Sequence, residues 1–166
     1  MRHYLGNSGD TLYEKVETML DDMPEMSTLA QSLVQNSATT ALKAISGGSG
    51  EKTFSSSWTS FYATEAISSD WFFALGGFSV SATGVVNKAT SGNTVRYKIH
   101  VFDRYNWDTG KSVTIGPWTF EDKELGALHL KGLAREYIVR GSSAEKVVSG
   151  WKAGSVIPPP STGGRD

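Results

Sequence analysis

The sequence predicts an α+β fold, with N-terminal helices, then a mainly antiparallel β-sheet, then a late helix packed on that sheet. Apolar residues recur at helical spacing in the first third of the chain, and the period changes to two after residues 47–50, Gly-Gly-Ser-Gly. At 166 residues the chain can bury the core of one domain. We expect that domain to span residues 1–155, followed by a disordered Pro/Gly-rich tail over 156–166.

The N-terminal helices are placed by their capping signals. Thr11 and Glu14 form a capping-box pattern ahead of apolar residues at helical spacing, so a first helix is expected to run from here to Pro24. Ser27 is expected to cap a second helix over residues 27–46, which carries a continuous apolar stripe. Such stripes usually pack on a sheet.

Alternation of apolar and polar residues predicts the strands of the sheet. The expected strands are residues 54–62, 71–75, 78–86, 94–102 and 111–120. A hairpin loop is expected over residues 87–93, and the last strand is expected to pair back on the 94–102 strand.

The late helix is expected to begin at Glu121 and Asp122, where acidic residues suit the helix dipole. Its core face would carry Leu125, Leu128, Leu133 and Tyr137, with His129 on the same face. Residues 138–141 are consistent with either the end of this helix or a return strand.

Composition and charge exclude several classes of function. The chain has no cysteine, which excludes disulfides, a thiol nucleophile and thiolate metal sites. It contains no apolar run long enough to span a membrane and no signal-peptide pattern. With a net charge of −1, nucleic acid is not expected as a partner, although the C-terminal half is mildly basic and suits an anionic ligand.

The corner at the end of the 94–102 strand contains the most informative residues. If the alternation continues, Asp103 falls on the buried face of the strand, which is costly for a carboxylate that is neither paired nor functional. In a purely structural role, Asp103 would accept turn hydrogen bonds and pair with Arg104 or Lys111.

In a functional role, this corner and the following helix would form one site. Asp103 and Asp108 would act as acid and base or hold a divalent metal ion, and His129 would assist proton transfer. Arg104 and Lys111 would bind an anionic group of the substrate. The further substrate-binding candidates are Tyr105, Trp107 and Arg135.

Standard hydrolase and metal signatures are absent from the sequence. No Gly-x-Ser-x-Gly is present, and the three histidines lack ligand-type spacing. Serines are plentiful, at 55–57 and 142–143, but a serine nucleophile needs a base within hydrogen-bond reach, which spacing alone does not show.

Four strings of residues resemble the C-terminal modules of bacterial polymorphic toxins, the variable ends of long secreted proteins deployed between competing bacteria. The strings are Asp-Trp-Phe-Phe-Ala-Leu-Gly-Gly-Phe (70–78), Val-Phe-Asp-Arg-Tyr-Asn-Trp-Asp-Thr-Gly-Lys-Ser-Val (101–113), Leu-His-Leu-Lys-Gly-Leu-Ala-Arg-Glu-Tyr (128–137) and Gly-Ser-Ser (141–143). The resemblance implies secretion or delivery into a target bacterium, and a cognate immunity protein that protects the producing cell.

A second resemblance is to the colicin M family, whose activity domain hydrolyses the lipid-linked peptidoglycan precursor. Its motif is Asp-x-Tyr-Asp followed by His-Arg. Asp103 and Tyr105 match it, whereas Asn106 occupies the position of the second Asp and no His-Arg follows nearby. The resemblance implies a substrate in the target-cell envelope, namely an anionic, lipid-linked cell-wall precursor.

The expected function is therefore that of an antibacterial, bacteriocin-like toxin with hydrolase activity on an anionic substrate. One alternative is a membrane-disrupting, pore-forming toxin that acts through the 27–46 helix. Another is a non-catalytic module in which Trp71, Tyr105 and Trp107 form a carbohydrate- or protein-binding platform.

Overall fold

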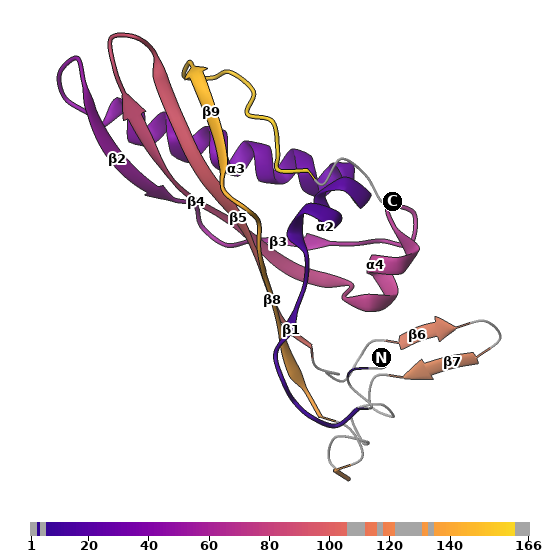
Figure 1. Cartoon of the computed structure of the whole chain (residues 1–166). Coiled ribbons are helices and arrows are strands. Elements are labelled where there is room, and N and C mark those ends of the chain that lie inside the picture. Colours follow the sequence, from indigo (N-terminus) through magenta and orange to yellow (C-terminus); the bar gives the residue numbers. More distant parts are fainter. Residues whose placement is uncertain are drawn as a thin grey trace.

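The computed structural model describes residues 3, 6–105, 112–115, 118–121, 131, 132 and 135–161. In this part of the chain, helices lie on a seven-stranded, mainly antiparallel sheet, which confirms the predicted α+β class (Figure 1). None of the helices in these residues is long and apolar enough to cross a lipid bilayer.

The large sheet has the order β1-β8-β5-β4-β2, with β3 also paired to β4 and β9 also paired to β5. Its strands are β1 (Leu12–Tyr13), β2 (Gly50–Ser55), β3 (Thr59–Tyr62), β4 (Gly77–Lys88), β5 (Asn93–Tyr105), β8 (Tyr137–Ser142) and β9 (Lys146–Trp151). Only the β1–β8 pair of this sheet is parallel. The long central strands β4 and β5 match the predicted hairpin and carry the rest of the sheet.

The prediction that residues 111–120 form one strand paired back on the 94–102 strand is wrong. β6 (Ser112–Ile115) and β7 (Trp118–Glu121) pair with each other in a separate two-stranded sheet and do not pair back on β5. The place of β5's next neighbour is taken by β8 and β9, of which Tyr137, Val139 and Trp151 are buried.

The predicted late helix over residues 121–137 is wrong at both ends. Glu121 lies in β7, and Tyr137 begins β8, so residues 138–141 form the return strand that the sequence also allowed. The cross-strand pairing of β8 with β5 fixes these residues in the sheet. Residues 122–130, the predicted body of the helix with Leu125, Leu128 and His129, lie outside the described residues.

The predicted capping box at the N-terminus is also wrong. Leu12 and Tyr13 form β1, and the Glu14 N–H donates to the carbonyl oxygen of Arg140 (2.8 Å). Sheet pairing therefore satisfies the backbone that a capping box would have used. Helix α2 (Val16–Asp22) begins only after this strand.

Pro24 begins a helix and does not simply end one. Helix α3 (Pro24–Lys43) has this proline in its first turn, where a missing N–H costs nothing. The predicted cap at Ser27 is therefore one turn too late. The helix lies along one face of the sheet, called here the inner face (Figure 1), and buries Met26, Ala30, Val34, Ala38 and Ala41.

Residues 71–75, predicted as a strand, form helix α4 (Ser69–Ala74) and its end. Ser68 caps the helix by accepting a hydrogen bond from the Trp71 N–H, and the Trp71 indole N–H donates to Asp22 (2.8 Å). The cap and this tie to α2 outweigh the strand preference of the aromatic run.

The predicted single strand over 54–62 is divided into β2 and β3. Both pair with β4, but the Ser56 hydroxyl accepts the N–H of Ala82 between them, in place of a backbone partner. Residues 56–58 therefore interrupt the edge of the sheet.

The chain after β9 returns to the core. Ile157 is fully buried, and the Tyr97 hydroxyl donates to the carbonyl oxygen of Pro158. The segment predicted to be a disordered tail thus packs on the inner face in its described part, up to Ser161. Residues 162–166 lie outside the described residues.

Candidate functional site

The residues at the end of β5, which the sequence singled out, lie on both faces of the sheet. Along β5, Val95, Tyr97, Ile99 and Val101 are buried on the inner face, as the alternation predicted. Asp103 follows them on that face and is half-buried, with buried Tyr105 two residues later, whereas Arg104 is exposed on the opposite, outer face.

Of the remaining predicted site residues, Asp108, Trp107, Lys111 and His129 lie outside the described residues. Arg135 is exposed, and its guanidinium donates to the carbonyl oxygen of Ser8 (3.3 Å). The structure therefore brings Asp103 and Tyr105 together and separates both from Arg104 by the thickness of the sheet.

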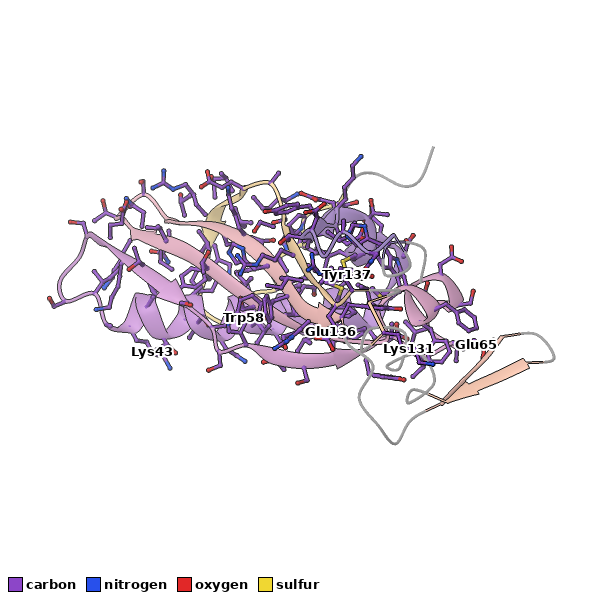
Figure 2. All side chains as sticks on the ribbon, turned by 90° about the horizontal axis from the view of Figure 1, so that it is seen from below. Lys43, Trp58, Glu65, Lys131, Glu136 and Tyr137 are labelled. Carbon is purple, nitrogen blue, oxygen red and sulfur yellow. The ribbon has the colours of Figure 1, made fainter. Side chains whose placement is uncertain are left out.

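The inner-face side chains at this end form a compact group, called here the strand-end cluster: His3, Glu14, Asp103, Tyr105 and Tyr137. The Tyr105 and Tyr137 rings stack with 4.7 Å between their centroids, and the His3 ring meets Tyr137 edge-on at 4.4 Å. Tyr137, in β8, is labelled in Figure 2.

Burial disfavours ionisation of two members of the strand-end cluster, Glu14 and Tyr137. It raises the pKa of the Glu14 carboxyl above its ordinary value. Burial likewise raises the pKa of the Tyr137 phenol, and the nearby Tyr105, Asp103 and Glu14 raise it further. The Tyr137 phenol therefore keeps its proton in the strand-end cluster.

Glu14 approaches the sheet closely because β8 carries a glycine beside it. A Cβ on Gly141 would meet the carbonyl oxygen of Glu14 at 2.6 Å and a methyl of Val16 at 2.8 Å. Any larger residue would push the β1–α2 connection, and with it Glu14, away from the strand-end cluster.

On the outer face, a histidine lies between two hydroxyl groups from the neighbouring strands. His100 in β5 is the direct cross-strand partner of Ser81 in β4 and of Ser142 in β8. Its Nδ1 lies 2.8 Å from the Ser142 Oγ, and its Nε2 lies 2.8 Å from the Thr83 Oγ1. We call Thr83, His100 and Ser142 the hydroxyl–imidazole row.

The surroundings of the row favour the neutral form of the imidazole. Burial lowers the pKa of His100, and the positive charge of Lys98 lowers it further. A neutral imidazole has one donor and one acceptor nitrogen. One of the two hydroxyls therefore donates its proton to the ring, which is the arrangement of a nucleophile beside its base.

Aromatic and basic side chains flank the row on the same face. Trp58, which is 55% exposed, contacts Phe102 edge-on with 6.1 Å between ring centroids, and the Arg140 guanidinium lies 5.7 Å from the centroid of the Phe102 ring. These three residues form the outer platform. Figure 2 shows Trp58 between Lys43 at one end of the molecule and Tyr137.

Two basic side chains of this face take no part in its salt bridges and could bind a ligand. Among the described residues, the salt bridges are Arg96–Glu51 (3.6 Å), which is solvent-exposed, and Arg104–Glu136 (3.2 Å), in which Arg104 is exposed and Glu136 half-buried. Such pairs contribute little to stability. Lys98 and Arg140 are exposed and belong to neither pair, so they can face an anion beside His100.

Sequence reasoning did not single out the hydroxyl–imidazole row. The alternation along β5 places His100 on the polar side with Lys98 and Phe102, and that signal was available. The partners of His100 could not be found in this way. Ser142 is 42 residues away, and only the β5–β8 register places it opposite His100. In the described residues, no cluster of carboxylates and histidines suited to a metal ion is present.

Comparison of the chain with family models, curated proteins and solved structures found no match.

Proposed function

We propose that this chain is the hydrolytic module of an antibacterial effector and that it acts on an anionic substrate at the outer face of the sheet. The observation that carries the proposal is the placement of His100 within 2.8 Å of the Ser142 and Thr83 hydroxyls. This is the nucleophile, base and orienting group that serine hydrolysis requires, in a single row.

The chemistry follows from the neutral imidazole. With its proton on Nε2, His100 donates to Thr83 and accepts from Ser142 through Nδ1. As the Ser142 oxygen attacks an ester or phosphoester centre, Nδ1 takes the hydroxyl proton and then passes it to the leaving oxygen. Water, deprotonated by the same nitrogen, then attacks the acylated or phosphorylated serine, the bond to the Ser142 oxygen breaks, and Nδ1 returns the proton to that oxygen. Thr83 is a positioning residue, since its hydroxyl holds the ring through Nε2.

The surroundings support an anionic substrate that also has an apolar part. Lys98 and Arg140 would hold its negative charge, while Trp58 and Phe102 offer an exposed apolar surface. A lipid-linked cell-wall precursor, the substrate class implied by the resemblance to colicin M, has both properties. With an envelope substrate, the proposal also includes delivery into a target cell and a cognate immunity protein in the producing cell.

A second candidate is acid–base chemistry at the strand-end cluster. It is favoured by the raised pKa of Glu14, which suits that carboxyl to act as an acid, with the half-buried Asp103 of the same cluster as a base. This candidate keeps the predicted role of Asp103 and leaves open a divalent metal ion held with Asp108.

Growth of a bacterium that expresses the chain, with and without an export signal, tests these candidates. We expect arrest by the wild-type chain and loss of arrest in His100→Gln and Ser142→Ala, while Asp103→Asn remains toxic. The reverse pattern would move the function to the strand-end cluster. If expression impairs growth in neither location, the effector proposal is wrong. Rapid depolarisation reported by a membrane-potential dye would favour the pore-forming alternative.

A further inference from the structure

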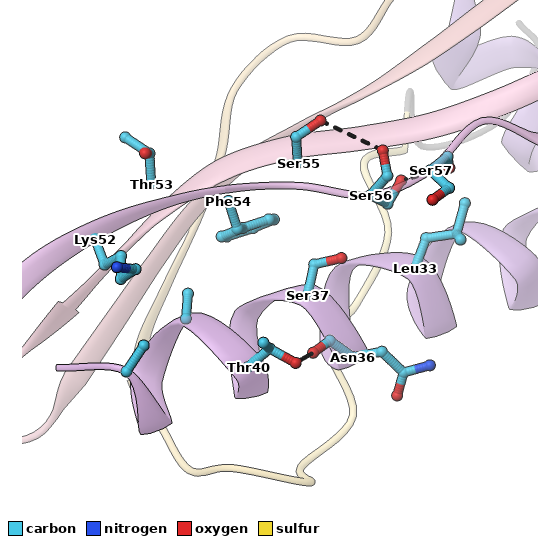
Figure 3. A pocket seen from close by; sticks show the side chains of 12 residues that line it. Leu33, Asn36, Ser37, Thr40, Lys52, Thr53, Phe54, Ser55, Ser56 and Ser57 are labelled. Atoms are coloured by element: carbon cyan, nitrogen blue, oxygen red, sulfur yellow. Dashed lines mark hydrogen bonds between the residues drawn. The ribbon is translucent and has the colours of Figure 1, made fainter.

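Helix α3 and the edge strand β2 enclose a groove that the proposed function does not use. Its volume is about 520 Å³, and Figure 3 shows β2 along one wall and α3 along the other. The wall from α3 extends over residues 33–44 and that from β2 over residues 52–57. At the rise per residue of a helix and of a strand, both walls are about 16 Å long. The groove thus fits an extended segment of about five residues.

Among the described residues, no strand pairs with the edge of β2 that faces away from β4. β2 is the last strand in the order of the sheet, and the Ser56 N–H, just beyond its end, donates to the carbonyl oxygen of Ala82 (2.8 Å). Because antiparallel strands alternate between hydrogen-bonded and non-hydrogen-bonded pairs, Lys52 and Phe54 also direct their backbone groups to β4. The backbone N–H and C=O groups of Glu51, Thr53 and Ser55 therefore point away from β4, toward the free edge of the sheet.

The side chains of the groove specify what could bind there. Lys52 is its one charged lining residue, and no acid is among the lining residues that the structure describes. The Phe54 ring lies against Gly84, where a Cβ would meet its Cζ at 2.5 Å, so the glycine leaves room for the ring beside α3. An acidic and an apolar side chain, two positions apart on an added strand, would face Lys52 and Phe54.

We propose that this groove binds an extended peptide segment of a protein partner as an additional strand on β2, with an acidic residue on Lys52 and an apolar residue on Phe54. Addition of a strand uses free edge groups in a period of two, which matches Glu51, Thr53 and Ser55. A second copy of this chain is the less suitable occupant, because an exposed lysine within an edge strand disfavours self-pairing.

Selection of random octapeptides displayed on phage against the full chain tests the proposal. We expect enriched peptides to carry an acidic and an apolar residue two positions apart. Binding should slow hydrogen exchange of the Glu51, Thr53 and Ser55 amides. Replacing single peptide N–H groups by N-methyl should weaken binding at least tenfold at alternate positions only, because only those N–H groups would face β2.

Matched variants separate the groove from the rest of the surface. Ser37→Trp fills the groove from α3 and should weaken binding at least tenfold, whereas Ser32→Trp, on the exposed side of the same helix, should not. Lys52→Glu should change the selected charge from acidic to basic. His100→Gln should bind as the wild type does, so this result is independent of the hydrolase proposal.

Three results would overturn the proposal. These are no enrichment of any peptide, enriched peptides that bind the Ser37→Trp variant equally well, and loss of binding upon N-methylation without alternation. Protection of the same three amides in a dimer of the chain alone, with its mass measured by sedimentation, would assign the edge to a second copy instead.

Discussion

Glu14 and His100 have opposite pKa shifts from the same physical cause. Burial penalises charge, so the pKa of the acid is raised on the inner face and that of the imidazole is lowered on the outer face. Each group is thereby held closer to neutrality than it would be in water. For His100 this means a ring nitrogen that can accept a proton near neutral pH, which the proposed reaction requires.

The shift at Glu14 predicts how stability depends on pH. Its pKa is raised in the folded state, so the folded protein binds more protons than the unfolded chain at pH values from about 4.5 up to the raised pKa. The stabilisation is complete below this window and is lost as the pH rises through it. Glu14→Gln stays neutral, so its unfolding free energy relative to wild type should rise between pH 4 and pH 7.

Urea titrations of both proteins at the two pH values measure this effect. Glu51→Gln is the control, because that exposed residue lies on the outer face and takes part in a solvent-exposed salt bridge. A stability difference for Glu14→Gln that is constant with pH would show that burial does not act on this carboxyl.

The candidate site could be predicted at the residue scale only in part. Alternation in β5 correctly placed Asp103 on the buried face, since a period of two fixes the face of every residue in a strand. The same period places Arg104 on the opposite face, away from Asp103, a consequence that grouping the two residues in one site overlooked. Spacing could not find Ser142 for His100, because that contact depends on the register between distant strands.

At the scale of elements, α4 shows how a local tie decides between helix and strand. Its aromatic run, Trp71-Phe72-Phe73, has strong strand preference, but the cap at Ser68 and the hydrogen bond from Trp71 to Asp22 fix it as a helix against α2. The indole N–H to carboxylate contact is part-buried and charge-assisted, so its loss should matter.

We predict that Trp71→Phe lowers the free energy of unfolding by about 1–2 kcal/mol, since it removes a donor from the Asp22 carboxylate. The same substitution at Trp58, which is exposed, is the matched control and should change it by less than about 0.5 kcal/mol. Denaturant unfolding of the two variants checks the difference. Equal stabilities for both would mean that α4 is held by packing alone.

The other elements show what local signals can determine. The hairpin of β4 and β5 was predictable because both strands have a clear period of two and a glycine-containing turn. The capping box failed because Thr11 and Glu14 satisfy a local pattern while Leu12 and Tyr13 pair with β8, more than a hundred residues away. Long-range pairing overrides local signals, and sequence spacing does not reveal it.

At the scale of the whole molecule, the C-terminal segment helps to close the core. The chain after β9 lies over the inner face. Ile157 is fully buried there, and the carbonyl oxygen of Pro158 accepts a hydrogen bond from the Tyr97 hydroxyl. Its proline-rich composition suggested disorder, but a single well-placed apolar residue can anchor such a segment.

We predict that Ile157→Ala lowers the free energy of unfolding by about 2–4 kcal/mol, because it removes buried methyl groups and leaves a cavity. The neighbouring Val156 is 70% exposed, so Val156→Ala should have an effect below about 0.5 kcal/mol. Thermal and urea unfolding measure both. If the two variants are equally stable, the segment does not belong to the folded core.

The proposed function depends on one contact, in which His100 activates the Ser142 hydroxyl. The most direct measurement is the reaction of the purified chain with a fluorophosphonate, followed by mass spectrometry to locate the adduct. We predict one modified residue, Ser142, with a rate that falls at least a hundredfold in His100→Gln and is unchanged in Asp103→Asn. Absence of an adduct on Ser142, or an equal rate in His100→Gln, would contradict the account.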